Sequence, residues 1–193
     1  MVVLAVKPKD AEAALAQARP HFTRGALLVS VAAGVSLKRL RALSGLRKVA
    51  RALPNVAARE RASLTALCFS RACSARNRKQ VHEIFGRLGE TVALREKSFE
   101  AFTYASACGP AVVAYLATAL RDSFEGLGMA EKLSLRVARA LLRGTASLVD
   151  RLSFEDIIGL VKTRGGYTER LLEAFERQGV ARGLRRAYRK VKA

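Results

Sequence analysis

The sequence is poor in residues that bind metals or form disulfides. It has three cysteines, Cys68, Cys73 and Cys108, two histidines, and no Cys-x-x-Cys pair. A structural metal site needs about four such ligands at close spacing, so we predict no metal site. Free cysteine is among the most frequently buried residue types. The three cysteines therefore predict buried thiols in a reducing compartment.

Aromatic residues and long apolar runs are also scarce. The 193-residue chain has no tryptophan, and aromatic residues make up 6% of it. No uninterrupted apolar run approaches the roughly 18 residues of a membrane span, and no apolar leader opens the sequence. Half of the residues are hydrophobic, and alanine and leucine recur throughout, which favours a folded, helix-rich protein. These features predict a soluble, cytoplasmic protein with no membrane partner.

Acidic residues are few. The chain has 16 of them against 35 lysines and arginines, which gives a net charge of +19. One interpretation is a nucleic-acid or acidic partner. The other is that arginines cover solvated helix faces. The basic residues run along the whole chain, which favours the second interpretation, so nucleic acid is not the favoured partner.

The first half of the chain alternates short apolar runs with helical patterns. Strands that alternate with helices imply right-handed crossovers and a mostly parallel sheet. We expect strands at 2–6, 26–33, 48–53, 63–70 and 91–94. We expect helices at 11–18, capped by Asp10, between Ser36 and Gly45, and at 75–88.

The first apolar run, Val2 to Val6, stops at Lys7-Pro8 and is typical of a buried strand. Such a strand needs neighbours on both edges, and an unpaired apolar edge is an aggregation hazard. We therefore expect another chain, or residues upstream of Met1, to cover this edge.

The period of the pattern changes after Glu96, and the rest of the chain shows helical patterns alone. They are expected at 98–123 with a break at Gly109-Pro110, at 130–152, at 153–161, from Thr168 to near Gly179, and at 180–192. Sequence pattern thus predicts an α/β domain, residues 1–97, followed by an all-helical domain, residues 98–193.

Five short motifs occur in a fixed order. They are Leu4-Ala-Val-Lys-Pro8, Val29-Ser-Val-Ala-Ala-Gly-Val35, Leu53-Pro-Asn55, Ser106-Ala-Cys-Gly-Pro-Ala111 and Thr163-Arg-Gly-Gly-Tyr-Thr168. The series resembles the pyrroline-5-carboxylate reductase family and covers the whole chain, but only the later part of the family's length. The resemblance implies a truncated Rossmann-like sheet without its first strands, then a helical dimerisation domain that forms homodimers or larger homo-oligomers.

The family transfers a hydride from NADPH or NADH to the imine carbon of pyrroline-5-carboxylate, giving proline. The resemblance implies cofactor contacts at the ends of parallel strands, where open α/β sheets bind ligands. The matching residues are Ala5, Val6, Lys7, Pro8, Ala33, Gly34 and Asn55. The residues that choose between NADPH and NADH lie outside the match.

The resemblance also implies a substrate loop made of Thr163, Gly165, Gly166 and Thr168. Thr168 matches the threonine that hydrogen-bonds the ring nitrogen of the imine, so it is the predicted catalytic residue. The two glycines match those whose amides hold the substrate carboxylate. Free N–H groups and a positive helix end would suit an anion there. The alternative is an ordinary helix break with Thr168 as its N-cap.

Departures from the family pattern bear on activity. No Gly-rich phosphate-binding loop is found, because neither Gly126-Leu-Gly128 nor Gly165-Gly166 follows an apolar strand. Arg164 and Tyr167 replace a proline and a small residue. We expect a reductase-like protein that is impaired or inactive as this chain alone. A start placed too late, a separate front half, or a relic that retains the dimer without the chemistry would each explain the pattern.

The rival function is a non-catalytic basic module. Arg182, Arg185, Arg186 and Arg189 form one face of the last expected helix, which could bind phosphates or an acidic partner. The opposite face carries Val180, Leu184, Tyr188 and Val191, which we expect to point inward and which also suit a dimer core. The basic face is then a solvated surface, and we favour that interpretation.

Overall fold

The structure is a computed structural model that describes residues 1–192. Ala193, the last residue of the predicted helical domain, lies outside the described residues. The chain divides into two compact units, residues 1–113 and 114–193. The first holds the sheet and the second is helical, so each is described by itself.

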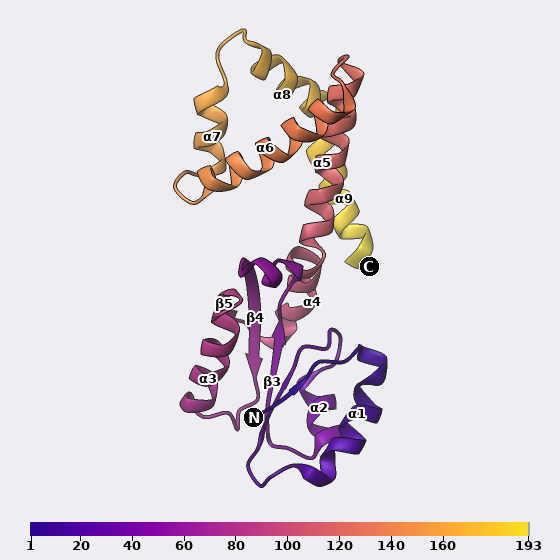
Figure 1. Cartoon of the computed structure of the whole chain (residues 1–193), viewed down its shortest axis with the longest axis vertical. Helices are drawn as coiled ribbons and strands as arrows, with labels where there is room; N and C mark the ends of the chain where they lie inside the picture. Colours follow the sequence, from indigo (N-terminus) through magenta and orange to yellow (C-terminus); the bar gives the residue numbers. More distant parts are fainter. Residues whose placement is uncertain (193) are drawn as a thin grey trace. The chain divides into compact units, whose positions relative to one another are not determined.

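The first unit contains a five-stranded sheet (Figure 1). Its strands follow the order β1-β2-β3-β4-β5, and every neighbouring pair is parallel except β3 with β4. The predicted mostly parallel sheet is therefore confirmed, with each strand inside or overlapping its expected run. The strands are β1 (Val2–Leu4), β2 (Leu27–Ser30), β3 (Lys48–Leu53), β4 (Ser63–Phe69) and β5 (Gly89–Ala93).

Helices cover both faces of this sheet. The α-helices are α1 (Ala11–Ala18), α2 (Leu37–Ser44), α3 (Ala75–Gly86), α4 (Phe99–Phe102) and α5 (Gly109–Gly126), which continues into the second unit. The short 3-10 helices are η1 (Pro8–Asp10), η2 (Arg19–His21), η3 (Val56–Glu60) and η4 (Glu96–Ser98), and η5 (Thr103–Ala107) is a π-helical turn.

Two apolar clusters hold the layers together. One packs Leu15 of α1, Leu40 of α2 and Phe99 of α4 against one sheet face. The other packs Val81 and Phe85 of α3 against the opposite face. Figure 1 shows α1 and α2 on one side of the strands and α3 on the other. Burial of these apolar side chains is the main stabilising contribution to this unit.

Helix ends follow the local chemistry in most places. The Ser36 hydroxyl accepts a hydrogen bond from the Arg39 amide at 3.1 Å, and Gly45 ends α2 with φ of +71°. Asp10 stands at the N-cap of α1, but its side chain makes no capping bond. The predicted position of the cap is therefore confirmed, but the capping bond is not made, because η1 leads directly into the helix with helical backbone angles. The expected break at Gly109-Pro110 comes earlier, at η5, and Pro110 lies in the first turn of α5, where its missing N–H costs little.

The second unit consists of helices with a small interior. After α5 come α6 (Glu131–Val149), α7 (Phe154–Val161), α8 (Tyr167–Gln178) and α9 (Val180–Lys192). A capping box opens the predicted helix α7, because the Ser153 hydroxyl and the Asp156 carboxylate bond to each other's backbone amides. Thr168 was expected to cap α8, but Gly166 is the N-cap, because its extended backbone ends the preceding turn.

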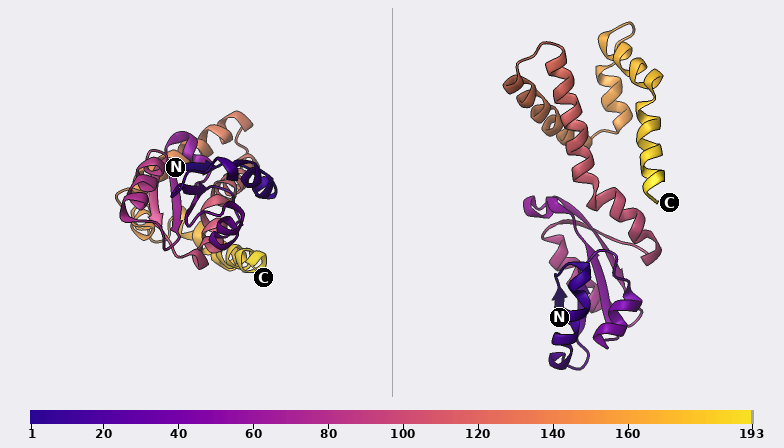
Figure 2. Two further views of the ribbon diagram at one scale, coloured as in Figure 1. Left: turned by 90° about the horizontal axis from the view of Figure 1, so that it is seen from below. Right: turned by 90° about the vertical axis from the view of Figure 1, so that its right-hand side faces the viewer.

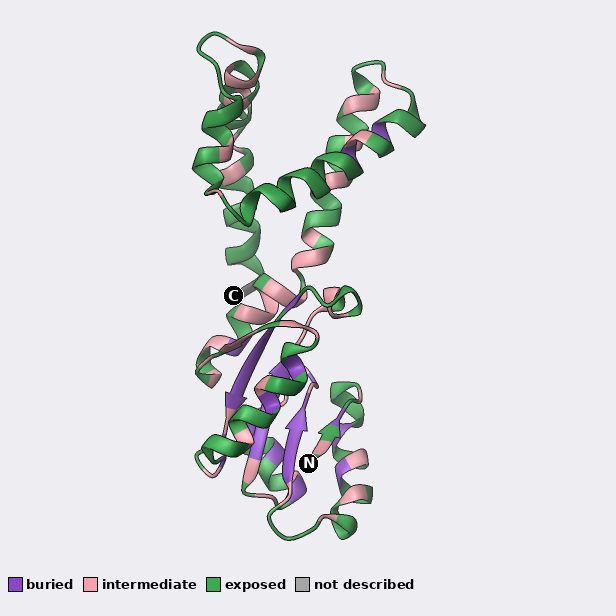
Figure 3. Ribbon diagram, turned by 60° about the vertical axis from the view of Figure 1, so that its left-hand side comes forward, coloured by how far each residue is buried: buried purple, intermediate pink, exposed green. Residues whose placement is uncertain are grey.

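Figure 2 shows the helices of this unit from two further sides. Most of the unit is exposed in the single chain (Figure 3). Among its described residues, Ser134 and Ala138 alone are buried. The apolar face of α9 was expected to point inward, yet Tyr188 is 38% exposed and Val191 is 62% exposed. Within a single copy α8 packs against α9, and the groove that α9 lines together with α5, α7 and α8 stays open.

A further exposed apolar stretch runs along residues 96–126. Among residues 1–192 it is the one helical stretch long and apolar enough to cross a membrane, judged by length and composition alone. Uninterrupted runs did not predict it, because Thr103, Ser106 and Thr118 separate the apolar residues without adding charge. No residue of its most apolar window is buried within the single chain.

We predict that Gly89→Ala destabilises the sheet. Gly89 has φ of +129°, and an added Cβ would collide with the backbone carbonyl of Ser63 on β4. The strained backbone and the clash should lower the free energy of unfolding by about 1–3 kcal/mol. Gly86→Ala is the matched control, because a Cβ at this helical position meets nothing within 4 Å. Urea titration followed by circular dichroism checks both variants, and equal stabilities would contradict the prediction.

Candidate functional site

The predicted cofactor residues follow three adjacent parallel strands. In the register of the sheet Leu4 lies opposite Ser30, and the Val31 amide donates to the Leu4 carbonyl at 3.1 Å. Strand β3 runs parallel to β2 and ends at Leu53. The structure therefore brings three segments to one edge of the sheet, where α/β sheets bind ligands. These are residues 5–8, residues 33–34 and Asn55.

The ends of these strands are open to a ligand. Ala5, Lys7, Pro8 and Gly34 are exposed, and Val6, Ala33 and Asn55 are half-buried. Gly34 has φ of +75°, and an added Cβ would meet nothing within 4 Å. A left-handed glycine with open space beside it allows a ligand to approach the backbone closely.

Asn55 also has a role within the chain. Its Nδ2 donates to the carbonyl and to the hydroxyl of Ser106, both at 3.2 Å, and its Oδ1 accepts from the Ala57 amide at 2.9 Å. The side chain thus ties the end of β3 to the π-helical turn η5. A cofactor contact by Asn55 stays a prediction.

A hollow of about 440 Å³ lies beside Gly34, between the sheet and the start of the helical segment. Arg51, Glu96 and Phe99 line it. The Glu96 carboxylate accepts from the Arg51 guanidinium at 3.0 Å and from the Leu37 amide, at the start of α2, at 2.6 Å. The guanidinium also lies 4.6 Å from the centre of the Phe99 ring. This cluster fixes the residues that follow the Ala33-Gly34 turn.

The Arg51–Glu96 pair was not among the features predicted from the sequence. The available signal was a single arginine inside the apolar strand Val49-Ala-Arg-Ala-Leu53, since a charge in a buried strand needs a partner. Nothing in the local pattern identified Glu96 as that partner.

The cysteines differ in their environment. Cys68 and Cys73 are buried, as predicted, whereas Cys108 is exposed at the turn before α5. Burial raises the pKa of the Cys68 thiol, and the nearby Glu96 carboxylate adds to this effect. A thiol with a raised pKa remains protonated and is a poor nucleophile. In the part of the chain that the structure describes, no three His, Cys, Asp or Glu residues cluster as metal ligands.

The predicted substrate loop precedes α8 in the second unit. Gly165 has φ of +72°, and a Cβ at Gly166 would collide with the Thr163 side chain. Both positions therefore favour glycine for local steric reasons. The expected free amides are not found at these two residues. The Gly165 amide donates to the Glu169 carboxylate at 2.7 Å, and the Gly166 amide donates to the Thr163 carbonyl at 3.0 Å.

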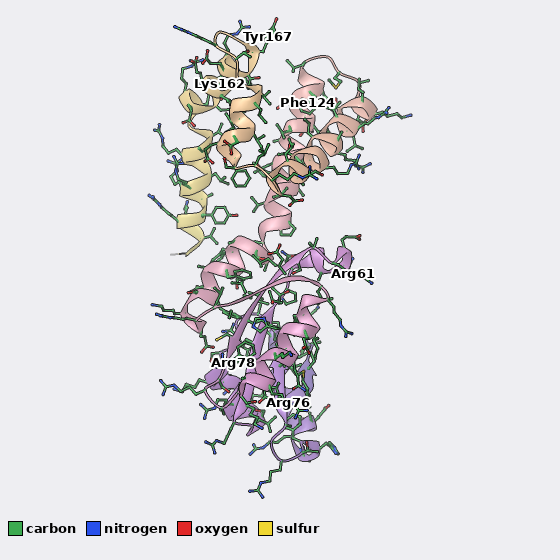
Figure 4. The ribbon with its side chains drawn as sticks, turned by 90° about the vertical axis from the view of Figure 1, so that its left-hand side faces the viewer. Arg61, Arg76, Arg78, Phe124, Lys162 and Tyr167 are labelled. Carbon is green, nitrogen blue, oxygen red and sulfur yellow. The ribbon has the colours of Figure 1, made fainter. Side chains whose placement is uncertain are left out.

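The start of α8 nevertheless offers donors near the predicted catalytic residue. The amides of Tyr167, Thr168 and Glu169 open the helix and have no acceptor inside it. Thr168 is half-buried in the first turn. Tyr167, which replaces a small residue of the family, is 86% exposed (Figure 4). The Arg170 guanidinium lies over its ring, 4.7 Å from the ring centre.

The Glu169 carboxylate is held from two sides. Besides the Gly165 amide, the Lys162 ammonium lies 3.3 Å from its second oxygen. The Gly165 hydrogen bond, followed by the bond from Lys162, lowers the pKa of Glu169 below its usual value. The carboxylate is therefore charged at neutral pH. Glu169 was not among the predicted site residues, although an acid three residues after an N-cap is a known signal.

An apolar groove of about 960 Å³ lies within the second unit. It lies between α5, α7, α8 and α9, and its lining includes Leu116, Ile158, Leu172, Phe175, Val180 and Leu184. Several of these side chains are also classed as exposed, Leu184 at 42% among them. A contiguous apolar surface of this kind is typical of an interface with another protein surface.

Comparisons with known proteins match these features. A family model described as pyrroline-5-carboxylate reductase dimerisation matches residues 96–193. A pyrroline-5-carboxylate reductase of Thermus thermophilus is 34% identical over 180 residues, covering 93% of this chain and 68% of that protein. One of Glycine max is 32% identical over 151 residues, covering 78% of this chain and 55% of that protein. The chain thus spans about half the length of this plant relative.

Solved structures agree with the sequence matches. A reductase of this name from Streptococcus pyogenes has a TM-score of 0.85 at 28% identity, covering 98% of this chain and 73% of that one. A Plasmodium falciparum pyrroline carboxylate reductase with NADP bound shares the fold, with a TM-score of 0.87 at 24% identity. The match covers 97% of this chain and 75% of that one. With a family model over residues 96–193 and a relative matched over 68% of its length, the chain belongs to the pyrroline-5-carboxylate reductase family.

Proposed function

We propose that this chain contributes the cofactor-facing strand edge, the substrate loop and the dimerisation helices of a pyrroline-5-carboxylate reductase. The observation that carries the proposal is the meeting of three parallel strand ends at one edge, with the open Gly34 turn among them. Family membership supports the reaction, and the NADP in a structural neighbour supports NADPH as the cofactor. The Rossmann-like part is residues 1–97 and the dimerisation part is residues 98–193.

The chemistry divides between the cofactor and the chain. NADPH supplies a hydride to the imine carbon when bound. Residues 5–8 would lie beside the dinucleotide and the Ala33-Gly34 turn near its nicotinamide half, and the Arg51–Glu96 pair keeps that turn in place. The Thr168 hydroxyl hydrogen-bonds the ring nitrogen of the substrate, which takes up a proton as the carbon is reduced. The donors at the start of α8 face the anionic end of the substrate.

We further propose that a second copy of the chain covers the apolar groove of the second unit and the exposed apolar stretch 96–126. The dimerisation model matches these same residues, which supports a homo-oligomer. The reductase is cytoplasmic in this proposal. The same apolar surface, covered in a dimer, then accounts for the membrane-like composition of residues 96–126.

Cofactor binding tests the proposed function most directly. Thermal unfolding of the purified chain with NADPH and with NADH should show a higher midpoint with the preferred dinucleotide, because a ligand of the native state stabilises it. Oxidation of that dinucleotide in the presence of pyrroline-5-carboxylate should follow. A midpoint that neither dinucleotide raises would reject the proposal.

We predict that Thr168→Val lowers kcat about 10- to 100-fold, the cost of one hydrogen bond to a charged or reacting group. Dinucleotide affinity should not change, because Thr168 lies on the substrate loop. Thr145→Val is the control, since it makes the same change at an exposed position of α6, outside the substrate loop, the apolar groove and the stretch 96–126. Steady-state kinetics on the three proteins decides, and equal kcat values would remove Thr168 from the proposed site.

A further inference from the structure

The substrate loop already holds a carboxylate that belongs to the chain. One carboxylate oxygen of Glu169 accepts a hydrogen bond from the Gly165 amide at 2.7 Å. The other oxygen lies 3.3 Å from the Lys162 ammonium. An amide donor and a cation are the partners that a ligand carboxylate would require. We propose that Glu169 is a specificity-determining residue that competes with the substrate carboxylate for this loop. The inference rests on the proposed function, which places the substrate there.

The geometry favours the internal carboxylate. Glu169 lies four residues after Gly165, so its side chain points back over the turn that precedes it. A group tethered at this distance has a high effective concentration compared with a free ligand. The Gly166 amide is taken by the Thr163 carbonyl, so it offers no substitute donor. A ligand carboxylate must therefore either displace Glu169 or bind the amides that open α8, close to the negative charge of Glu169.

Two consequences follow for the ligands of this loop. Removing the Glu169 charge frees the Gly165 amide and the Lys162 ammonium together, and binding of a carboxylate should become tighter. Ligands without a carboxylate should be insensitive to the change. An acid at this position that only stabilises the start of α8 would behave differently. Its removal would weaken the helix and leave carboxylate binding unchanged.

The test uses the full-length purified chain and two probes, L-proline and L-prolinamide, which differ in the carboxylate. Calorimetry in the presence of NADP should show that Glu169→Ala binds proline about tenfold or more tightly than the wild type, the effect of one charge-assisted hydrogen bond. Glu169→Gln should lie between them, because its amide oxygen can still accept from Gly165. Prolinamide affinity should be the same in all three proteins.

Glu173→Gln is the matched control. It removes the same charge one turn further along α8, where Glu173 pairs with Arg177 at 3.6 Å. Its proline affinity should equal that of the wild type. The amide resonance of Gly165 in an NMR spectrum gives an independent readout, and it should shift in Glu169→Ala but not in Glu173→Gln.

Two outcomes overturn the inference. One is proline binding by Glu169→Ala that is no tighter than wild type, including the case in which neither binds. The other is a Gly165 amide resonance that does not respond to the substitution. Failure of the proposed function would give a different result. The chain would neither bind nor oxidise the dinucleotide, while Glu169→Ala would still shift the Gly165 resonance and tighten proline binding.

Discussion

Leu184→Glu should convert the proposed homo-oligomer into a monomer. Leu184 lines the apolar groove between α5, α8 and α9 and is 42% exposed in the single chain. In a symmetric dimer the substitution occurs twice, so each interface loses two buried leucines and gains two carboxylates. Losing a buried leucine costs about 1.5–3 kcal/mol, and an unpaired buried charge costs several more. Analytical ultracentrifugation should show the dissociation constant rising by a factor of about 10³ or more.

Gln178→Glu provides the control for charge. It introduces the same side chain and the same change in net charge at an exposed position at the end of α8, outside the groove. Its dissociation constant should equal that of the wild type. If both variants dissociate the dimer, long-range charge repulsion and not a contact within the groove would explain the effect. A Leu184→Glu protein that stays dimeric would place the interface on another surface.

Glu96→Ala should strongly destabilise the first unit. The Arg51 side chain is 10% exposed, and Glu96 is its ion-pair partner at 3.0 Å. The substitution leaves a largely buried guanidinium without a counter-charge and the Leu37 amide without its acceptor. Breaking a buried pair costs about 3–5 kcal/mol, and Glu96 is itself 37% exposed, so we expect a loss of about 2–4 kcal/mol in the free energy of unfolding. Urea titration at fixed protein concentration measures it.

The chain contains its own control for this effect. Arg39 and Glu12 form a pair at 2.6 Å, shorter than the Arg51–Glu96 pair, but their side chains are 55% and 66% exposed. Glu12→Ala should therefore cost less than about 1 kcal/mol. Burial, and not distance, decides the difference between the two pairs. Equal losses in the two variants would contradict this account.

Local patterns predicted most of the elements. The strand Lys48–Leu53 has the expected bounds, and Ser36, Gly45 and Ser153 mark helix ends where their side chains or backbone angles require it. These features depend on neighbours within a few residues, which the sequence displays directly. Asp10 stands at the N-cap of α1 without a capping bond, because η1 precedes the helix. Thr168 was wrong as a cap, because the extended backbone of Gly166 places the start of α8 before it.

The candidate site was predictable in part. The ordered motifs indicated the family, and parallel strand ends then had to meet at one edge of the sheet. The partners of the polar groups were not predictable in the same way. Asn55 bonds Ser106, 51 residues away, and Glu96 bonds the Leu37 amide, 59 residues away. Contacts over such separations leave no periodic signal in the sequence.

The sequence by itself determined the alternation of strands and helices, the change to helices after Glu96 and the membership of a reductase family. Tertiary structure decided which carboxylate pairs with the buried Arg51 and which apolar faces one copy leaves exposed. It also showed that Glu169 occupies the Gly165 amide. The physical reason is that propensity and motif order are local properties. Burial and charge pairing exist only once distant segments, or the rotamer of a particular side chain, have been fixed in space.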